Sequence, residues 1–353
     1  MASLNAMNTS STMTVSDRPL MTFALLAYNQ ERYVREAIEG AFAQTYSPLQ
    51  IILSDDCSSD RTFDIIQQMS GAYTGPHQIT LNRNPRNLGV GAHVNRVFEL
   101  ALGEIVVLGA GDDISLPHRV ATLAAEFSDD VTVVYSSATV VDECGKVLRR
   151  ESIYPDPQNE TSYAYRASTY CRGVVGCSAA YSKKVFQGFG PLLPSTIAED
   201  RVLAFRGYAV GKVRFVEEPL VKYRAHAQNI WSTRRVTSNE GLRQMVARRA
   251  RIRRISYIQY GADLQSNGVM GADAADVAAA RRIAAQRLIE AEAEELVLSR
   301  RWRERLAGLW RCMTRRMSLF TRVKLLLIGT TRWVYLYKLK RFGARLDASA
   351  NAH

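Results

Sequence analysis

The sequence lacks the features that mark disulfide-rich, zinc-binding and membrane-spanning proteins. Its five cysteines are odd in number and form no Cys-x-x-Cys or Cys/His cluster, which argues against a disulfide framework and a structural zinc site. No uncharged stretch reaches the roughly 18 to 20 residues needed to cross a bilayer. Residues 1–18 are rich in Ser, Thr and Met and lack a basic segment followed by an apolar one, so we expect a disordered tail and no signal peptide. These absences favour a cytoplasmic location.

Acidic residues are scarce in the C-terminal third of the chain. Residues 241–353 contain 23 Lys and Arg against 9 Asp and Glu, whereas the rest of the chain contains 23 against 25. Such an excess is typical of a segment that meets an anionic surface, although a solvated helix face is the alternative. Because no RNA- or DNA-binding signature accompanies the charge, nucleic acid is not an expected partner.

Two pairs of aspartates are the most informative feature that the sequence does contain. Asp55-Asp56 follows the apolar run Leu49–Leu53, and Asp112-Asp113 follows Glu104–Leu108. Short apolar runs between helical patterns are typical of buried parallel strands, and ligands bind at the carboxyl ends of such strands. Neighbouring carboxylates repel one another, so we expect a divalent cation, Mg²⁺ or Mn²⁺, to join them and to bring a phosphate group. The alternative is that each pair caps the helix that follows.

The order of the elements predicts a doubly wound α/β domain. Val34, Ala37, Ile38, Ala41 and Phe42, for example, recur with the period of a helix that buries one stripe. Strands are expected at residues 22–26, 49–53, 78–81, 104–108, 131–136, 177–181, 213–216 and 220–223, with a hairpin formed by 138–141 and 146–149. Helices are expected at residues 31–42, 62–69, 90–101 and 117–127, from 199, and throughout the chain from about 236.

Six motifs follow one another along the first two thirds of the chain. They are Leu26-Ala27-Tyr28-Asn29, Asp55-Asp56-Cys57-Ser58-Ser59-Asp60, Asn87-x-Gly89, Gly103-Glu104, Gly111-Asp112-Asp113 and Pro117-x-Arg119. In this order and spacing they resemble family 2 glycosyltransferases of the GT-A fold, and the match extends over residues 20–235. That fold is Rossmann-like, with a mostly parallel mixed sheet and helices on both faces.

The resemblance implies transfer of a sugar from a nucleotide-diphosphate donor to an acceptor hydroxyl, with inversion at the anomeric carbon. It implies that Tyr28 stacks on the base, that Asp56 accepts a hydrogen bond from the base, and that Asp112 faces the ribose or the donor sugar. Other positions implied in donor binding are Ala27, Asn29, Asp55, Asn87, Gly89, Glu199 and Arg224.

The resemblance also implies the groups that carry the chemistry. Asp113 would coordinate the cation, with His226 as a second metal ligand, and Asp200 of the Glu199-Asp200 pair would take the proton of the acceptor hydroxyl. Arg224 and His226 belong to a Tyr-Arg-x-His-x-x-Asn segment that closes over the diphosphate in many members. Each residue has a simpler alternative: Asp200 as a helix cap, His226 as a hydrogen-bonded loop residue, and Arg224 as the partner of Glu217 or Glu218.

Two departures from the family pattern concern the donor pocket. Many members carry Asp-x-Asp-Asp before the metal, but this chain has Gly109-Ala110-Gly111-Asp112-Asp113, which supplies one carboxylate fewer. Many members also have Arg before Asn in the helix after Asn-x-Gly, where this chain has Val94-Asn95.

The predicted organisation is a tail at 1–18, a GT-A domain at 19–235, a basic helical region at 236–345 and a tail at 346–353. The basic, aromatic stretch 318–341 suits an anionic membrane surface on the inner face of the cell membrane, packing against the catalytic domain, or a homo-oligomer interface. The acceptor is expected to be a glycan or a lipid-linked saccharide, in cell-surface polysaccharide or glycolipid synthesis. A non-catalytic scaffold is the alternative function. Nucleotidyl transfer is disfavoured, because residues 27–31 contain no Gly-rich phosphate loop.

Overall fold

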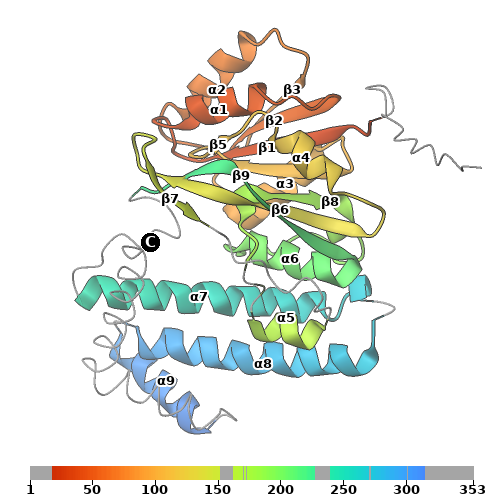
Figure 1. Ribbon diagram of the computed structural model, residues 1–353. Helices are drawn as coiled ribbons and strands as arrows, with labels where there is room; N and C mark the ends of the chain where they lie inside the picture. Colours follow the sequence, from red (N-terminus) through yellow and green to blue (C-terminus); the bar gives the residue numbers. More distant parts are fainter. Residues whose placement is uncertain are drawn as a thin grey trace, which may run out of the picture.

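The computed structural model describes residues 18–151, 162–169, 171, 173–226, 239–269, 272–299 and 301–314. Its main feature is a mixed sheet with the strand order β3-β2-β1-β4-β8-β6-β9-β5, with β7 paired to β6 (Figure 1). The strands are β1 (Met21–Ala27), β2 (Leu49–Asp55), β3 (Gln78–Arg83), β4 (Ile105–Ala110), β5 (Ile114–Ser115), β6 (Val131–Val141), β7 (Val147–Glu151), β8 (Ala179–Ser182) and β9 (Lys212–Arg224).

The first half of the sheet is parallel, because β1 pairs with β2 and β4, and β2 pairs with β3, all in the same direction. The antiparallel β8 joins β4 to β6, and β6 then runs parallel to β9. Connections between parallel strands require crossovers, which helices provide here. The helices are α1 (Val34–Phe42), α2 (Thr62–Gly71), α3 (Val90–Leu100), α4 (Arg119–Ala125), α5 (Tyr163–Thr169), α6 (Glu199–Val210), α7 (Asn239–Asp263), α8 (Ala274–Val297) and α9 (Trp302–Thr314), with short 3-10 turns η2 (Gly176–Ser178), η3 (Lys183–Val185) and η4 (Asn267–Val269).

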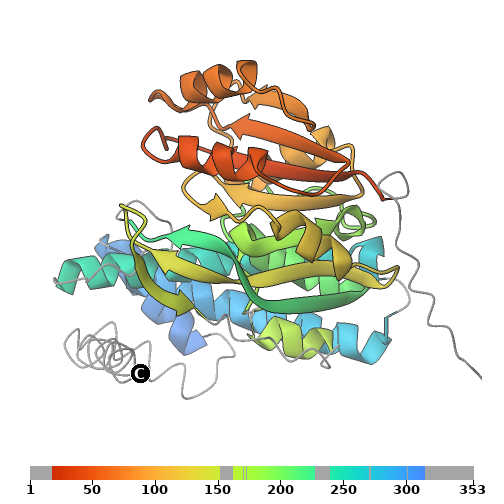
Figure 2. The same ribbon diagram turned by 45° about the horizontal axis from the view of Figure 1, so that its top comes forward.

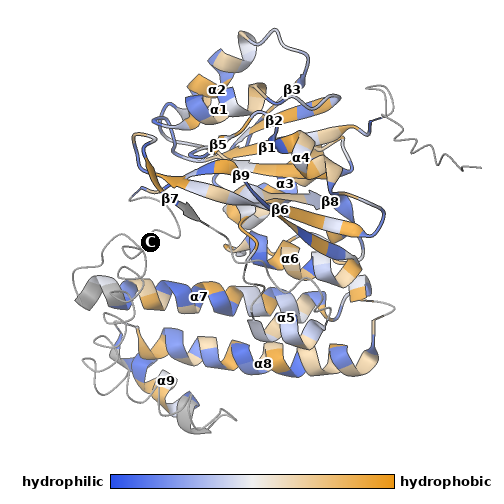
Figure 3. Ribbon diagram, viewed as in Figure 1, coloured by the Kyte–Doolittle hydropathy of each residue, from blue (hydrophilic) through white to orange (hydrophobic). Residues whose placement is uncertain are grey.

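Each face of the sheet has its own core, and this confirms the predicted α/β architecture with helices on both faces. On one face, α1 and α4 bury Val34, Ile38 and Val120 against Phe23 and Ile51 of β1 and β2. Of the apolar stripe predicted at 34, 37, 38, 41 and 42, the first four residues are buried and Phe42 is half-buried. The central strands β1, β4, β6 and β8 are predominantly apolar, as expected for strands that bury both faces. The helices have both hydrophobic and hydrophilic residues along their length, as expected for elements that bury one face (Figure 3).

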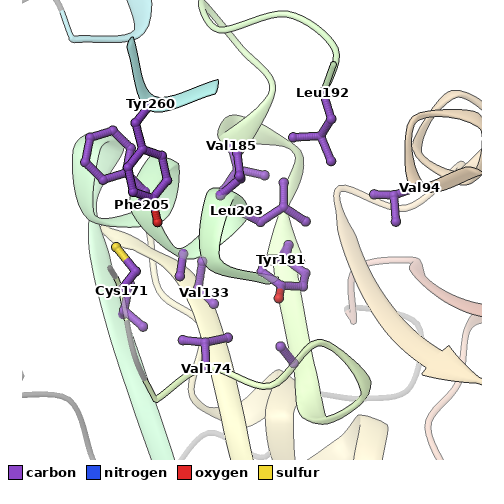
Figure 4. Packing of buried hydrophobic residues seen from close by; sticks show 14 of the residues in the cluster. Val94, Val133, Cys171, Val174, Tyr181, Val185, Leu192, Leu203, Phe205 and Tyr260 are labelled. Atoms are coloured by element: carbon purple, nitrogen blue, oxygen red, sulfur yellow. The ribbon is translucent and has the colours of Figure 1, made fainter. Parts of the chain in front are cut away.

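The opposite core continues beyond the sheet into α7 and α8. Leu203 and Phe205 of α6 share one cluster with Val133 of β6 and Tyr181 of β8 (Figure 4). Tyr260 of α7 stacks on Phe205, with ring centroids 4.4 Å apart. Figure 2 shows α7 and α8 as a further layer outside α6. On α7, Ile252 and Ile255 are buried and Ile258 is 37% exposed. Residues 318–341 lie outside the described residues.

The sequence prediction was wrong about two strands, each of which was divided into two. Residues 131–136 and 138–141 form the single strand β6, and 213–216 and 220–223 form the single strand β9. The β6–β9 register passes from Ser136↔Val216 to Ser137↔Pro219, so Glu217 and Glu218 bulge out of the ladder. A bulge accommodates the proline, which has no N–H for the ladder. The predicted strand at 177–181 also begins later, at Ala179, because η2 occupies residues 176–178.

A buried ion pair connects α6 to α7. Arg206 and Asp263 are 0% and 1% exposed, and the guanidinium donates two hydrogen bonds to the carboxylate, at 2.9 Å and 2.8 Å. The Arg206 side chain also donates to the Gly190 carbonyl at 2.8 Å and lies against the Phe186 and Phe189 rings. The surrounding structure thus holds the Arg206 guanidinium in the geometry of a bidentate pair. Removing either partner alone would leave an uncompensated buried charge and lower the stability of the protein.

We expect Asp263→Ala to lower the free energy of unfolding by about 3 to 5 kcal/mol, because it leaves the Arg206 charge buried without its partner. The urea midpoint measures this loss. Glu126→Ala is the control, since it breaks the exposed Arg214–Glu126 pair and should change stability little. Equal effects of the two variants would show that the α6–α7 pair does not hold the helical layer in place.

Candidate active site

The candidate site lies at the carboxyl ends of β1, β2 and β4, which the backbone holds in register. The Asp56 N–H donates to the Ala27 carbonyl at 2.9 Å, and the Gly111 N–H donates to the Leu26 carbonyl at 2.9 Å. Gly111 packs closely against the end of β1, since a Cβ atom there would lie 2.5 Å from Gln30 Oε1 and 3.0 Å from the Ala27 Cβ atom. The two aspartate pairs therefore emerge on either side of the end of β1.

Asp55 is fully buried and stabilises the loop that follows β2. Its carboxylate accepts hydrogen bonds from the Ser58 N–H, at 2.9 Å, and from the Ser58 hydroxyl, and it lies 3.5 Å from the Arg83 guanidinium. The capping alternative fails for this pair, because α2 begins only at Thr62, whose N–H donates to Asp60. It fails for Asp112-Asp113 as well, since β5 follows directly.

Asp56 organises the loop between β3 and α3. Its carboxylate accepts hydrogen bonds from the Asn84 side chain, at 2.8 Å, and from the N–H groups of Leu88 and Gly89, at 2.8 Å and 3.0 Å. Gly89 has φ of +78°, a left-handed conformation that favours glycine, and its N–H also donates to the Asn87 side chain. The structure thus brings Asp56, Asn87 and Gly89 together, as their predicted roles require.

Tyr28 and Asn29 lie at the open edge of this group. Tyr28 is 45% exposed, so its ring is available for stacking. Asn29 adopts φ of +52°, and its side-chain oxygen accepts a hydrogen bond from the Ser59 N–H at 2.9 Å. This bond ties the end of β1 to the loop after Asp56 and fixes the direction in which Tyr28 leaves the strand.

Asp112 and Asp113 are both buried beside the end of β9. The Arg224 N–H donates to Asp113 Oδ1 at 2.8 Å, and His226 Nε2 lies 2.8 Å from Asp112 Oδ2. The Arg224 guanidinium is 1% exposed and pairs with Glu36 at 3.0 Å, not with Glu217 or Glu218 as the simpler alternative proposed. Arg224 and His226 therefore contact the two aspartates that are predicted to bind the cation.

The negative charge of Asp113 is unfavourable in its buried position. Burial raises the pKa of its carboxyl group well above the usual range, and the neighbouring charge of Asp112 raises it further. The Arg224 N–H, the Cys177 thiol and the Arg119 charge oppose this shift. Burial lowers the pKa of Arg119 to about 10, so its guanidinium remains charged at neutral pH.

The turn η2 connects this pair of carboxyl groups to the Glu199-Asp200 pair. The Cys177 thiol contacts Asp113, while the adjacent Gly176 N–H donates to Asp200. α6 approaches Gly176 closely, since a Cβ atom there would lie 2.7 Å from Glu199 Oε1 and 3.5 Å from the Asp200 Cβ atom. Two successive residues thus bring the carboxylates of β4 and α6 into one site.

The two carboxyl groups of α6 differ in their affinity for protons. Burial, followed by the charge of Asp200, raises the pKa of Glu199 to about 8. Burial also raises the pKa of Asp200, but the charge and N–H of Arg201 and the Gly176 N–H lower it. The surroundings therefore favour the protonated form of Glu199, while the Arg201 and Gly176 groups favour the charged form of Asp200.

The carboxylates of Asp112 and Asp113 fit part of a divalent cation site. Their oxygens are the ligands that Mg²⁺ and Mn²⁺ prefer, and a cation would offset the unfavourable charge of Asp113. In the ranges that the structure covers, no three His, Cys, Asp or Glu side chains are grouped to hold a metal ion. His226 contacts Asp112, and its role as a metal ligand stays a prediction. A diphosphate and water would supply the remaining ligands.

Sequence reasoning assigned no role to three residues of the site, the buried Arg119 and Tyr181 and the half-buried Cys177. Arg119, in the Pro117-x-Arg119 motif, donates to Ser115 and to the Leu108 carbonyl, at 2.8 Å and 2.7 Å, and so supports the strand that carries Asp112-Asp113. Cys177 and Tyr181 lie in an apolar run that predicted only a strand. No sequence signal distinguishes them from core residues.

The departure at Val94-Asn95 has a structural explanation. Val94 is buried in the core, and the Asn95 amide exchanges two hydrogen bonds of 2.8 Å with the backbone of Leu192. This residue pair therefore fixes the loop that leads into α6 and Asp200.

Comparison with known proteins agrees with this geometry. Residues 22–190 match the family model described as glycosyl transferase family 2. An uncharacterized protein from Mycobacterium tuberculosis is 27% identical over 215 residues, which cover 60% of each chain. An uncharacterized glycosyltransferase from Nostoc sp. is 28% identical over 210 residues, covering 57% of this chain and 63% of the relative. The chain thus spans less than two thirds of the length of these relatives.

Two solved structures share the fold. TarS from S. aureus, in complex with UDP-GlcNAc, superimposes with a TM-score of 0.58 at 15% identity over 92% of both chains. The mannosyltransferase PcManGT from Pyrobaculum calidifontis, in complex with GDP-Man and Mn²⁺, gives a TM-score of 0.50 at 17% identity over 96% of this chain and 86% of its own. The family match and the six motifs show that residues 22–190 form a domain of the glycosyltransferase family 2 type, and the likeness to the two solved structures shows that its fold is GT-A.

Proposed function

We propose that this protein is an inverting glycosyltransferase that moves a sugar from a nucleotide-diphosphate donor to an acceptor hydroxyl in one displacement. The observation that carries the proposal is the η2 turn, which contacts Asp113 through Cys177 and Asp200 through Gly176. A donor whose diphosphate lies at Asp112-Asp113 would have its anomeric carbon near the Asp200 carboxylate. One base close to the sugar is sufficient for inversion, which forms no covalent intermediate.

The donor would be held along the ends of β1, β2 and β4. Tyr28 would stack on the base, and Asp56, which is already fixed by the 84–89 loop, would accept a hydrogen bond from the base edge. Ala27, Asn29 and Asp55 would shape this end of the pocket. Because protein hydrogen bonds hold these groups beforehand, the donor would bind without ordering them.

Asp200 would act as the general base. A sugar hydroxyl is a poor nucleophile at neutral pH, so a carboxylate that takes its proton during attack lowers the barrier. Glu199, protonated at neutral pH because its pKa is about 8, would donate a hydrogen bond to the donor or the acceptor. The difference in pKa between the two neighbours assigns one role to each.

The departing nucleoside diphosphate accumulates negative charge. Asp112 and Asp113 would hold Mg²⁺ or Mn²⁺, which neutralises that charge when bound. Arg224 holds both aspartates, since its backbone N–H donates to the Asp113 carboxylate and its Nε donates to the Asp112 carbonyl at 3.0 Å. His226 would orient the Asp112 carboxylate through their hydrogen bond.

We propose a glycan or lipid-linked saccharide as the acceptor, in cell-surface polysaccharide or glycolipid synthesis. The charge of residues 241–353 supports peripheral attachment to an anionic membrane on the cytoplasmic face, with a homo-oligomer as the other role of this region. No helix in the described part of the chain is long and apolar enough to span a bilayer.

Asp200→Asn should retain donor binding but lower transfer about 10²- to 10⁴-fold, because the amide cannot accept the hydroxyl proton. The measurement is nucleoside-diphosphate release from a panel of nucleotide sugars with Mn²⁺, together with donor affinity. Glu217→Gln, at an exposed position of β9, is the matched control. Near-native turnover of Asp200→Asn would place the base elsewhere, and a wild-type protein inactive on every donor would favour the scaffold.

Glu199→Gln should stabilise the protein more at pH 9 than at pH 5. The folded state holds the Glu199 proton up to about pH 8, whereas the unfolded chain releases it near its ordinary value of 4.5. Between these values the folded state binds more protons, so the wild-type protein loses stability as the pH rises. Melting temperatures at the two pH values test this. A constant difference between wild type and variant would mean that Glu199 is ionised at neutral pH.

A further inference from the structure

A cleft of about 620 Å³ lies between α7, α8 and α9, outside the candidate active site. Four arginines line it: Arg248, Arg251 and Arg254 from α7, and Arg311 from α9. The acidic residues of its wall come from α8 and the start of α9. No residue of the proposed transferase chemistry contributes to it.

Each carboxylate of this cleft already has an arginine partner. Glu295 accepts from Arg254 at 2.6 Å, and Glu292 accepts from Arg311 at 2.8 Å. The third, Glu304, accepts from Arg301 at 3.3 Å and from the Ser299 hydroxyl. The acidic charge of the cleft is therefore compensated by these pairs.

Arg248 and Arg251 are left with uncompensated charge. Both are exposed and line the cleft, and no carboxylate among the residues with described side chains pairs with either of them. Because they are three residues apart on α7, their guanidinium groups lie on the same face of the helix. Two planar guanidinium forks at this spacing suit the oxygens of one phosphate group.

Two apolar side chains are exposed on α9, the helix that contributes Arg311 to the cleft. Leu306 and Trp310 are 56% and 65% exposed, and their i, i+4 spacing places them on one face, with the exposed Arg303 one turn earlier. Trp310 directly precedes Arg311, which lines the cleft. Exposed Trp and Leu next to arginines are typical of surfaces that lie in the headgroup region of a bilayer.

We infer that the α7–α8–α9 cleft binds the phosphate headgroup of an anionic membrane lipid through Arg248 and Arg251, while Leu306 and Trp310 enter the interface. A bilayer fits better than a dissolved anion, because a dissolved phosphate would leave the two exposed apolar side chains in water. This inference rests on the proposed peripheral attachment and assigns it a binding site. It is independent of the sugar chemistry.

The test is flotation of the full chain with vesicles of phosphatidylcholine alone or with 30% phosphatidylglycerol. Arg248→Gln with Arg251→Gln should lower the partition coefficient for anionic vesicles about 30-fold, at roughly 1 kcal/mol per arginine near the surface. Arg282→Gln with Arg287→Gln removes the same charge from exposed positions of α8 and should cost much less. Trp310→Ser should reduce the binding that persists in high salt.

The possible results distinguish lipid binding in the α7–α8–α9 cleft from membrane binding of the protein by another region. If wild type binds neither kind of vesicle, the attachment itself is wrong, and nucleoside-diphosphate release measured in parallel reports on the transferase proposal separately. If the α7 and α8 double variants lose binding equally, or if only deletion of residues 318–353 abolishes binding, the cleft is not the site. Binding of dissolved pyrophosphate through Arg248 and Arg251, without vesicle binding, would overturn the lipid assignment.

Discussion

The mutual repulsion of buried carboxylates is the constraint on which the rest of this site depends. Asp112 and Asp113 lie side by side within the fold, and Glu199 and Asp200 approach them across η2. The protein compensates this charge only in part, with the Arg224 backbone, the Cys177 thiol and the buried Arg119. A cation and a diphosphate donor would supply the positive charge that is still missing. Burial and the Asp200 charge raise the pKa of the neighbouring Glu199 to about 8.

Maintaining that arrangement requires rigid support from distant parts of the chain. The loop before α6 is held by the Asn95 amide and by Gln259 of α7, whose side chain accepts from the Leu193 N–H at 2.7 Å. The Arg206–Asp263 pair fixes α6 itself to α7. The helical layer therefore contributes to the position of Asp200 even though it supplies no reacting group. Its outer side, with the uncompensated Arg248, remains available for the proposed membrane contact.

Sequence patterns predicted the α/β fold because its first half obeys simple rules. Each apolar strand is followed by an amphipathic helix, and polar motifs follow the strands at fixed positions. The errors fall where tertiary pairing overrides local signals: Ser136-Ser137 and Pro219 look like breaks, yet the parallel β6–β9 pairing absorbs them as a bulge. The meeting of Cys177 with Asp113, and of Gly176 with Asp200, depends on packing between elements far apart in sequence. The spacing of apolar residues along the sequence carries no information about such contacts.

The most direct test of this account is the location of a metal ion and a diphosphate in crystals of the full chain. Crystals grown with Mn²⁺ and uridine or guanosine diphosphate would be measured at the manganese absorption edge. The account requires an anomalous peak beside Asp112 and Asp113, with the diphosphate on the side that faces η2 and Asp200. A peak elsewhere, or a nucleoside diphosphate bound away from the ends of β1 and β4, would contradict it.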